Sequence, residues 1–239
     1  MTFDQHNFDV RCEWGAEGVA RLAAGSDAVI VVDVLSFSTC VSIAADRGAS
    51  VYPFAGSLTE AQAFAVQHHA LLANKDRRAP GYTLSPSSLM EIQAGTRLVL
   101  PSPNGSRLST MSGSTPTFAG CLRNARTVAE KAQRLGRRIS VIPAGERWRP
   151  EDALRPALED WFGAGAIIHH LTGTKSIEAQ AAEALFLTFR ERLHDSLSQI
   201  GSGRELIEQG FSDDVRLAAE LNVSDIAPRL IDGVYRMSE

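Results

Sequence analysis

Apolar runs alternate with segments of helical spacing along the first two thirds of this chain. The run AVIVVDV, residues 28–34, is continuous and rich in β-branched side chains, which is typical of a strand buried in a parallel sheet. The next segment, SFSTCVSIAADRG, begins with residues that cap helices and ends at Gly48, which predicts a helix. The same alternation predicts further strands at residues 50–54, 97–103, 115–120 and 138–145.

The segments between these strands have helical patterns, with one exception. Helices are predicted at residues 57–73, 104–111 and 121–136. From Leu154 onward the chain is mostly helical in pattern and includes one long helix over residues 176–200. The stretch 74–95 is rich in Pro, Ser and Gly and predicts a long loop, and loops of that length inside a domain are usually functional.

Together these elements predict the fold class. Alternating strands and helices favour an α/β fold with a mainly parallel sheet flanked by helices and a helix-rich C-terminal half. No linker composition divides the chain, so we predict one domain over residues 1–239. A two-lobed form of that domain, with a cleft between approximately residues 1–140 and 141–239, also agrees with the pattern.

Composition and charge narrow the function only by exclusion. The chain is 44% hydrophobic and 22% charged, and its net charge of -4 gives no electrostatic case for binding nucleic acid or an anionic membrane. No apolar run reaches the ~18–20 residues of a membrane span, and the first residues lack the pattern of a signal peptide. Three widely spaced cysteines argue against a disulfide framework or a zinc site. We therefore expect a cytoplasmic protein.

Polar, loop-forming residues follow three of the predicted strands. They are Asp33 with the hydroxyl-rich turn 36–39, the segment PSPNGS at 101–106, and the segment PAGER at 143–147. Ligands of open parallel sheets bind outside the carboxyl ends of the strands. We therefore expect these three segments to meet and to form the functional site.

The turn after Asp33 lies where a helix is predicted to begin. Backbone N–H groups at a helix N-terminus suit a phosphate, and the hydroxyls of Ser36, Ser38 and Thr39 would add donors. An acid beside a phosphate makes sense if a divalent cation lies between them, or if Asp33 attacks phosphorus. The alternative is an ordinary N-cap next to a strand-end acid.

The second segment also has a functional and an ordinary interpretation. Asn104-Gly105 marks a tight turn in which Gly105 lets the backbone approach a ligand closely. Ser106 would then begin the next helix, and Arg107 would be available to bind an anion. The alternative is a plain turn with no ligand.

Acidic residues near the third segment offer ligands for a hard cation. Mg²⁺ usually takes one or two carboxylates together with waters and substrate phosphate. Glu146, Glu159 and Asp160 could supply these carboxylates beside Asp33. Acids in the first turn of a helix also serve simply to complement the helix dipole, and this remains the alternative for Glu159 and Asp160.

Six segments in register resemble the 2-phosphosulfolactate phosphatase family. They are VVDVLSFST, LPSPNGS, GCLRNA, VIPAGE, LEDWFGAGAI and the tail GSGRELIEQGFSDDVRLAAELNVSDIAPRL, and they span about residues 29–230. The resemblance implies an α/β phosphomonoester hydrolase that depends on Mg²⁺. Its reaction would convert (2R)-2-phospho-3-sulfolactate to 3-sulfolactate and phosphate.

The resemblance also carries over residue by residue. Asp33 is the acid of the family's strand-end element D-V-L-R-A-T-T. The family's N-G turn, A-G-E/T segment, E-D pair and C-terminal segment are matched by Asn104-Gly105, Gly145-Glu146, Glu159-Asp160, and residues 201–203 with Asp213-Asp214.

Two departures from the family pattern concern the substrate. Ser36 stands where the family usually has Arg, and Leu84-Ser85-Pro86 stands where it has N-S-P. A substrate with both phosphate and sulfonate needs cationic partners, so another arginine would have to take the place of the missing one. The candidates are Arg107, Arg123, Arg147 and Arg149.

We therefore predict a Mg²⁺-dependent phosphatase of small anionic phosphomonoesters. Asp33, Glu146 and Asp160 would be catalytic, with Asp33 as metal ligand or nucleophile, and Asp33, Glu159 and Asp160 would hold the metal. The residues expected to bind substrate, through backbone amides, hydroxyls and guanidinium groups, are Ser36, Ser38, Thr39, Asn104, Gly105, Ser106, Arg107 and Arg147.

Two other functions agree with the same residues. One is a non-catalytic protein that binds an anionic metabolite on the same fold, and the other is a hydrolase or lyase of another anionic metabolite. A homo-oligomer is left open, because the predicted helix 176–200 has an apolar stripe wide enough to cover either the sheet or a partner subunit.

Overall fold

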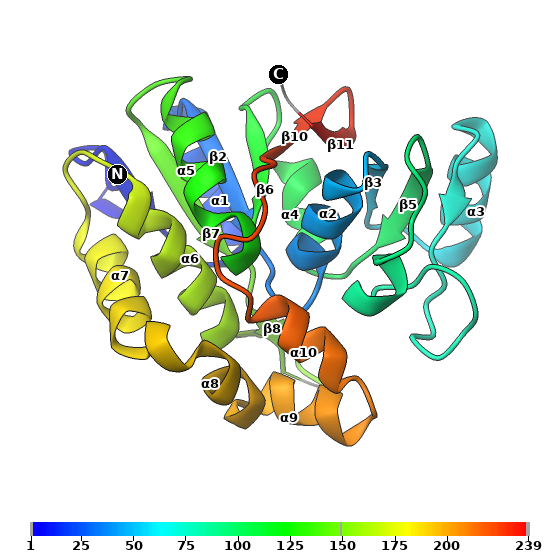
Figure 1. The fold of residues 1–239 in the computed structure, drawn as a ribbon. Coiled ribbons are helices and arrows are strands. Elements are labelled where there is room, and N and C mark those ends of the chain that lie inside the picture. The colour runs from blue at the N-terminus through cyan, green and yellow to red at the C-terminus, as the bar shows by residue number, and fades with distance from the viewer. Residues whose placement is uncertain (1, 149, 238–239) are drawn as a thin grey trace.

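The continuous apolar runs form the strands of a twisted sheet. The computed structural model describes residues 2–148 and 150–237, and Figure 1 shows the sheet at its centre with helices packed around it. The five predicted strands are present as β2 (Ala28–Val32), β3 (Ser50–Phe54), β5 (Arg97–Pro101), β6 (Thr117–Gly120) and β7 (Ile139–Pro143). The α/β class predicted from the sequence is confirmed.

The sheet contains two parallel groups of strands. In the first, β1 (Val10–Cys12), β7, β2 and β6 are neighbours in that order, and every pair is parallel. In the second, β3, β5 and β4 (Leu71–Leu72) are parallel neighbours. Across the described residues the sheet has nine strands. They come from both of the segments, approximately residues 1–140 and 141–239, that a two-lobed form would separate.

A C-terminal hairpin joins the two groups, and the sequence pattern did not predict it. β10 (Pro228–Ile231) pairs antiparallel with β6, and β11 (Val234–Met237) pairs antiparallel with β3. The turn between them is Asp232-Gly233, and both residues have positive φ, as a tight hairpin turn requires. The Asp-Gly pair between two short apolar runs was the signal that could have revealed this hairpin.

Helices cover both faces of the first strand group because its side chains alternate. Ile30 and Val32 belong to a core cluster with α5 (Ala125–Gln133) and α6 (Leu158–His170). Val29 and Val31 point to the opposite face, where they join Val19 and Leu108. Those two residues belong to α1 (Gly15–Leu22) and α4 (Gly105–Met111). Because β2 is buried on both faces, its sequence is a continuous apolar run.

The helix α2 (Phe37–Asp46) and the second strand group form a further core. α2 is buried along its length and packs against β3 and β6 and against the 3₁₀ turn η3 (Pro86–Leu89). The predicted helix at residues 57–73 is shorter than expected and is α3 (Leu58–Gln67). It begins with a capping box between Ser57 and Glu60.

The C-terminal half is helical, as predicted, but its longest helix is broken. Residues 176–200 form α7 (Ile177–Phe189), the turn η5 (Arg190–Arg192) and α8 (Leu193–Gln199). The break turns Leu193 and Leu197 into the core, where they are 5% and 0% exposed. The chain continues as α9 (Gly201–Glu208) and α10 (Ser212–Ala218), which lie together with α8 at one end of the molecule (Figure 1).

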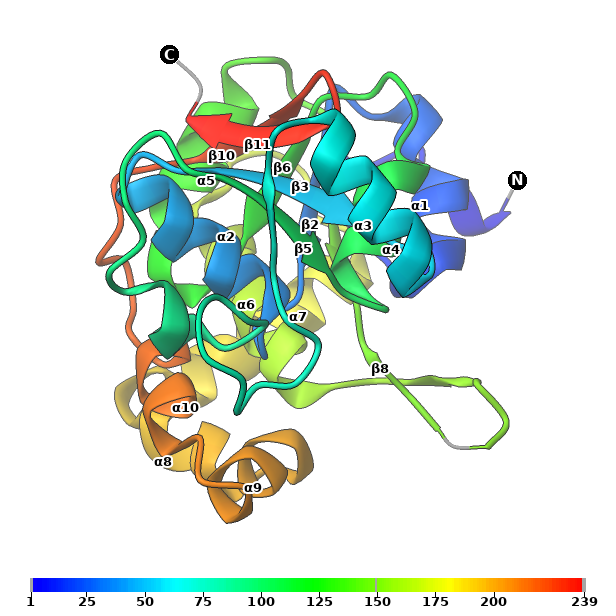
Figure 2. The same ribbon diagram turned by 90° about the vertical axis from the view of Figure 1, so that its right-hand side faces the viewer.

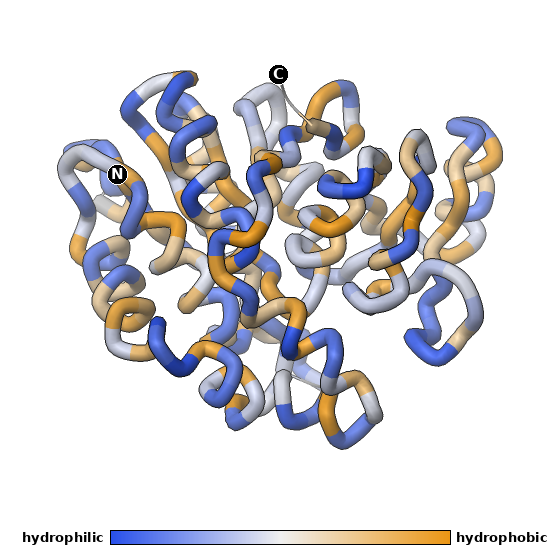
Figure 3. The backbone as a smooth tube through the Cα atoms, in the orientation of Figure 1, coloured by the Kyte–Doolittle hydropathy of each residue, from blue (hydrophilic) through white to orange (hydrophobic). Residues whose placement is uncertain are grey.

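Two irregular segments surround the ends of β2 and β7. Residues 74–95 form the predicted long loop, interrupted by η3, and we call residues 74–85 the central loop. β8 (Glu146–Arg147) and β9 (Leu154–Arg155) form a small hairpin that reaches away from the rest of the chain (Figure 2). In Figure 3 the outer part of the central loop is hydrophilic, whereas the strands of the sheet are largely hydrophobic.

Two further findings bear on the compositional expectations. Among the described residues, every helix is too short or too polar to cross a membrane. Cys12, Cys40 and Cys121 are buried and free.

We predict that the C-terminal hairpin is essential to the core. The Tyr235 ring is 1% exposed and packs edge-on against Phe37, and its hydroxyl donates to Ser109 Oγ at 2.8 Å. Tyr235→Ala should therefore lower the free energy of unfolding by about 3–5 kcal/mol. Tyr235→Phe should lower it by about 0.5–1.5 kcal/mol, because only the hydrogen bond is lost.

Urea denaturation followed by circular dichroism measures both effects. The matched control is Met237→Ala on the same strand, where the side chain is 62% exposed, and its effect should stay within about 0.5 kcal/mol. Equal losses for Tyr235→Ala and Met237→Ala would contradict this account of the core.

Candidate active site

Asp33, directly after β2, is held by the first amides of two helices. Its Oδ1 accepts a hydrogen bond from the N–H of Phe37 in α2 at 3.2 Å, and its Oδ2 accepts one from the N–H of Gly105 in α4 at 2.8 Å. The hydroxyl of Ser102 lies 3.4 Å from Oδ2. The carboxylate is 6% exposed and occupies the position at both helix N-termini that an anion favours.

Position 105 requires glycine because the space that a Cβ would occupy is already filled. A Cβ there would lie 2.3 Å from the Phe37 ring and 2.8 Å from Asp33 Oδ2. Asn104-Gly105 therefore lets α4 approach the end of β2, which is the close approach that the sequence predicted for a ligand. In the structure the partner of that approach is Asp33 itself.

Asp160, in the first turn of α6, connects the ends of two neighbouring strands. Its Oδ1 accepts from Val34 N–H at 2.7 Å, just after β2, and its Oδ2 accepts from Gly145 N–H at 2.8 Å, just after β7. Gly145 has a φ of +69°, a conformation that side chains rarely adopt. Both oxygens of this buried carboxylate are thus engaged by backbone donors, which gives Asp160 a clear structural role.

Glu146, at the start of β8, is less enclosed than the two aspartates. Its Oε2 accepts from Asn104 Nδ2 at 3.1 Å, so the second and third predicted segments also meet. Glu146 and Asn104 line a cavity of about 210 Å³ together with Arg147 and Trp148 of the β8–β9 hairpin. The predicted convergence of the three segments is confirmed by the contacts Asp33–Gly105, Asn104–Glu146 and Gly145–Asp160.

Three buried acids and the half-buried Glu146 share this region, and burial raises the pKa of each. The pKa values of Asp33 and Asp160 are raised first by burial, against the opposing effect of their backbone donors. Burial raises the pKa of Glu146 to about 7, and the charges of Asp33 and Glu159 add to the rise. Burial also raises the pKa of Glu159, which a hydrogen bond from Ser202 and the charge of Arg155 oppose. The acids therefore repel one another in a poorly solvated site.

The metal prediction has no preformed ligand cluster to support it. In residues 2–148 and 150–237, no group of three or more Asp, Glu, His or Cys side chains is arranged to hold a metal ion. Mg²⁺ itself needs only one or two carboxylates when waters and substrate phosphate complete its coordination. The assignment of Asp33, Glu159 and Asp160 to a metal stays a prediction.

The hydroxyls expected at the phosphate are used by the fold instead. Ser38 Oγ donates to the carbonyl of Val31 at 3.2 Å and accepts from the N–H of Asp33 at 3.1 Å. Thr39 Oγ1 donates to the carbonyl of Val34 at 2.7 Å, and Ser106 Oγ to the carbonyl of Leu100 at 2.9 Å.

The structure also differs from the expectation for the backbone amides. The amides of Phe37 and Gly105 bind the carboxylate of Asp33, and the amide of Ser38 binds its carbonyl at 2.8 Å. The helix ends are therefore occupied by the protein's own acid.

The arginines proposed from the sequence lie in different environments. Arg147 lines the cavity beside Glu146 and donates to the carbonyl of Asp152 at 2.8 Å. Arg107 is exposed on α4. Arg123 is 8% exposed and pairs with Asp46 and Glu220. Arg149 lies outside the described residues.

Sequence reasoning missed the cation that is found at Ser36. Arg77 of the central loop reaches Ser36, and its Nη2 lies 3.3 Å from Ser36 Oγ. Its charge lowers the pKa of Asp33, against the larger effect of burial. The excess of basic residues in the loop sequence KDRR was the available signal, but its distance from Ser36 in the sequence gave no hint of the contact.

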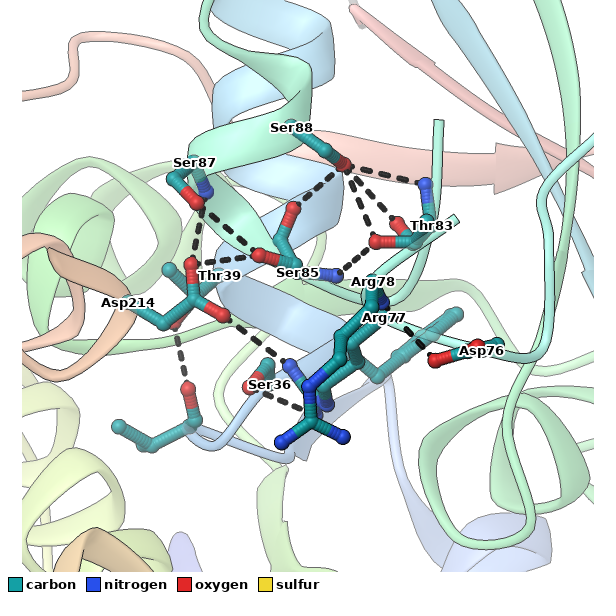
Figure 4. A network of polar contacts seen from close by, with 12 residues as sticks. Ser36, Thr39, Asp76, Arg77, Arg78, Thr83, Ser85, Ser87, Ser88 and Asp214 are labelled. Carbon is teal, nitrogen blue, oxygen red and sulfur yellow. Dashed lines mark hydrogen bonds and ion pairs between the residues drawn. The ribbon is translucent and has the colours of Figure 1, made fainter. Parts of the chain in front are cut away.

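The central loop is fastened to α10 by one buried acid, Asp214 (Figure 4). Asp214 Oδ1 accepts from Ser85 Oγ at 2.7 Å and from Ser87 N–H at 2.9 Å. Its Oδ2 forms an ion pair with Arg77 Nη1 at 3.2 Å. The two segments singled out by resemblance around Ser85 and Asp214 are thus in direct contact, although 129 residues separate them.

The raised pKa values predict that stability falls as pH rises. In the folded protein Glu146 keeps its proton up to about pH 7, whereas the unfolded chain releases it near the ordinary value of 4.5. Between these values the unfolded chain binds fewer protons, so the free energy of unfolding decreases with rising pH. Without metal, Glu146 should contribute a loss on the order of 1–3 kcal/mol between about pH 5 and pH 8.

Urea denaturation in EDTA at a series of pH values tests this prediction. Glu146→Gln should flatten the pH dependence, because the amide does not titrate. Glu91→Gln, at an exposed acid, is the matched control and should keep the wild-type slope. The same slope for wild type and Glu146→Gln would show that Glu146 does not titrate in this range.

Comparisons with known proteins agree with the resemblance found in the sequence. The family model described as 2-phosphosulpholactate phosphatase matches residues 18–233. A 2-phosphosulfolactate phosphatase from Methanothermobacter thermautotrophicus is 29% identical over 216 residues, which cover 90% of this chain and 92% of that protein. A probable 2-phosphosulfolactate phosphatase from Carboxydothermus hydrogenoformans is 33% identical over 214 residues, which cover 86% of this chain and 87% of that protein.

The family match covers both sides of the site, from the helix before β2 to the turn of the C-terminal hairpin. The predicted family and the predicted enzyme class are both confirmed by it. The chain belongs to the 2-phosphosulpholactate phosphatase family, which is a family of phosphoric monoester hydrolases.

Proposed function

We propose that this protein hydrolyses (2R)-2-phospho-3-sulfolactate to 3-sulfolactate and phosphate, and that the reaction depends on Mg²⁺. The observation that carries the proposal is the group of four acids with raised pKa values, one of which, Glu146, lines the cavity of about 210 Å³, in a chain of this family. Charged and polar residues make up more than half of the cavity lining, which suits a small polar substrate better than an apolar one; they are Asn104, Glu146, Arg147 and Asp152.

The charge balance of the site supports a divalent cation. Asp33, Glu146, Glu159 and Asp160 supply up to four negative charges, and each has a raised pKa. A phosphomonoester would bring further negative charge into the same region, which these acids disfavour. When bound, Mg²⁺ would neutralise this charge and polarise the phosphoryl group.

Asp33 and Glu159 are the residues that we propose to hold the metal. Both are carboxylates with oxygen donors of the kind Mg²⁺ prefers, and the charge of Asp33 raises the pKa of Glu159. A cation between them would remove this repulsion. Asp160, the third acid predicted to hold the metal, engages a backbone N–H group with each oxygen, as Asp33 does, and stays a candidate beside these two.

Glu146 is the residue that we propose to handle the proton. Its side chain borders the cavity, and Asn104 fixes one of its carboxylate oxygens. From this position Glu146 can accept a proton from an attacking water at its other oxygen. It can also return a proton to the sulfolactate oxygen that leaves phosphorus.

Arg147 and Arg107 were predicted to bind the remaining anionic groups of the substrate. Arg147 lines the cavity and supports this proposal directly. Arg107 is exposed on α4, in the same helix as Gly105, and its role rests on the sequence argument alone.

We predict that phosphate release from 2-phosphosulfolactate requires Mg²⁺ and Asp33. EDTA should abolish release, and added Mg²⁺ should restore it. Asp33→Asn should lower kcat/KM by about 10²-fold or more, because a metal-stabilised charge contributes several kcal/mol to the transition state. Glu146→Gln should lower kcat by about 10²–10⁴-fold, which is the usual contribution of general acid–base catalysis.

A phosphate assay on 2-phosphosulfolactate and phosphoglycolate measures these effects, with Glu91→Gln as a control that should keep wild-type activity. Near-full turnover by Asp33→Asn would overturn the site assignment. Tight binding without phosphate release from either substrate would instead select a non-catalytic binding protein. Release of a different product would select another reaction on the same fold.

A second prediction concerns metal binding without catalysis. Mg²⁺ at ten times its Kd should stabilise the folded protein by about 1.4 kcal/mol, because it binds the folded state. At one fixed Mg²⁺ concentration the effect should be larger near pH 8 than near pH 5.5, since protons compete with the metal for acids whose pKa is raised.

Thermal unfolding with and without Mg²⁺ measures this stabilisation. Glu159→Gln should lose most of it, whereas Glu91→Gln should retain it. A melting temperature that Mg²⁺ leaves unchanged at both pH values would contradict a metal site at these acids.

A further inference from the structure

We infer that Arg77 and Ser36 form a binding subsite for a second anionic group of the substrate. Besides its phosphate the substrate carries a carboxylate and a sulfonate, and the subsite would bind one of these two. This inference rests on the proposed function and extends it to substrate selection. It concerns a residue of the central loop that lies 41 positions from Ser36 in the sequence.

The position of Arg77 is the first observation. Its side chain is 19% exposed, and its Nη2 lies 3.3 Å from the hydroxyl oxygen of Ser36. Ser36 ends the turn between Asp33 and α2 and is 2% exposed. The contact with Ser36 places the Arg77 guanidinium at the turn that directly follows Asp33.

The way in which Arg77 is held is the second observation. Asp214 is fully buried, and its Oδ2 pairs with Arg77 Nη1 at 3.2 Å. Its Oδ1 is shared by Ser85 and Ser87, which fix the carboxylate against the base of the central loop. The Arg77 guanidinium also lies over the ring of Phe211, 5.9 Å from its centroid. Arg77 is therefore pre-oriented before any ligand arrives (Figure 4).

The chemistry of guanidinium is the third step. Arginine presents five N–H donors in a planar fork, and the contacts with Asp214 and Ser36 account for two of them among the described residues. The fork matches the paired oxygens of a carboxylate or sulfonate. A substrate with a second anionic group next to its phosphoester would thus bind Arg77 through that group while its phosphate binds at the proposed acidic site. Asp214 is then a positioning residue, because it acts through Arg77.

A comparison of three phosphomonoesters separates the effect of the second anionic group on kcat/KM from that of the phosphate. Phosphoglycolate carries a carboxylate, 2-sulfoethyl phosphate carries a sulfonate, and ethyl phosphate carries neither. Arg77→Gln should lower kcat/KM about 10- to 100-fold for whichever of the first two the wild-type enzyme prefers, mostly through KM. For ethyl phosphate the loss should stay below about threefold, because that substrate has nothing for Arg77 to bind.

Two further variants distinguish the loss of the Arg77 contact from a general disruption of the central loop. Arg77→Lys keeps the charge but lacks the fork, and should show an intermediate loss for the two anionic substrates. Arg78→Gln is the matched control, because Arg78 is the exposed neighbour in the same loop and donates to the carbonyl of Gln209. Its selectivity among the three substrates should match that of the wild type.

A binding measurement keeps this inference separate from the proposed reaction. 3-Sulfolactate has no phosphate. Calorimetry with Mg²⁺ present should show that it binds Arg77→Gln at least about tenfold more weakly than it binds wild type. If wild type released phosphate from no substrate, the proposed function would fail, and this binding difference would still support the subsite. Equal affinity of the two proteins, or no binding to wild type, would overturn it. So would equal kcat/KM losses on all three phosphomonoesters.

Discussion

The carboxylate of Asp33 is the contact on which the geometry of the site depends. It accepts amide hydrogens from the first turns of α2 and α4, and so fixes both helices to the end of β2. The arrangement continues into the core, because the carbonyl of Gly105 accepts from Ser109 Oγ at 2.7 Å, and Ser109 accepts from Tyr235. A strand-end acid is therefore connected through α4 to the C-terminal hairpin at the centre of the sheet.

Asp160 likewise fixes α6 to the ends of β2 and β7. Burying the carboxylates of Asp33 and Asp160 lowers the stability of the fold for an electrostatic reason. Burial raises the pKa of each aspartate, so the folded protein gives up part of the stability that uncharged residues would provide. Two backbone donors on each carboxylate offset this cost in part. Under the proposed Mg²⁺ dependence, the acids that lower the stability of the metal-free protein would be the groups that bind the cation, which is a trade-off between stability and activity.

The sequence predicted the strands and the meeting of their polar ends, but it did not identify the partners that these polar groups have within the fold. The apolar run of β2, the Asn-Gly turn and the acid after β7 are local patterns, and local patterns determine where strands end. Which atom satisfies a given N–H depends on packing. The turn after Asp33 shows this, because its amides and hydroxyls bind Asp33, Val31 and Val34, and packing selects these partners.

Contacts between distant segments lie beyond such patterns for a related reason. Arg77 reaches Ser36 only because Asp214, 137 residues further along the chain, holds its other nitrogen. The C-terminal hairpin was missed because a helical stretch precedes it and two short strands carry a weak periodic signal. In both cases the decisive partner is remote in sequence, and a single sequence without tertiary contacts does not identify it.

The acids and the cations of the site differ in where the fold places them. The carboxylates of Asp33 and Asp160 lie at the ends of β2 and β7, where a change would disturb the helices that they attach to these strands. The positive charges come from segments outside the sheet: Arg77 from the central loop, and Arg155 from the β8–β9 hairpin, where it acts on Glu146 and Glu159. Loops tolerate substitution far better than strand ends do. Under the proposed function, the fold can therefore keep its acids for the phosphoryl chemistry while changes in these two segments would alter which second anion is accepted.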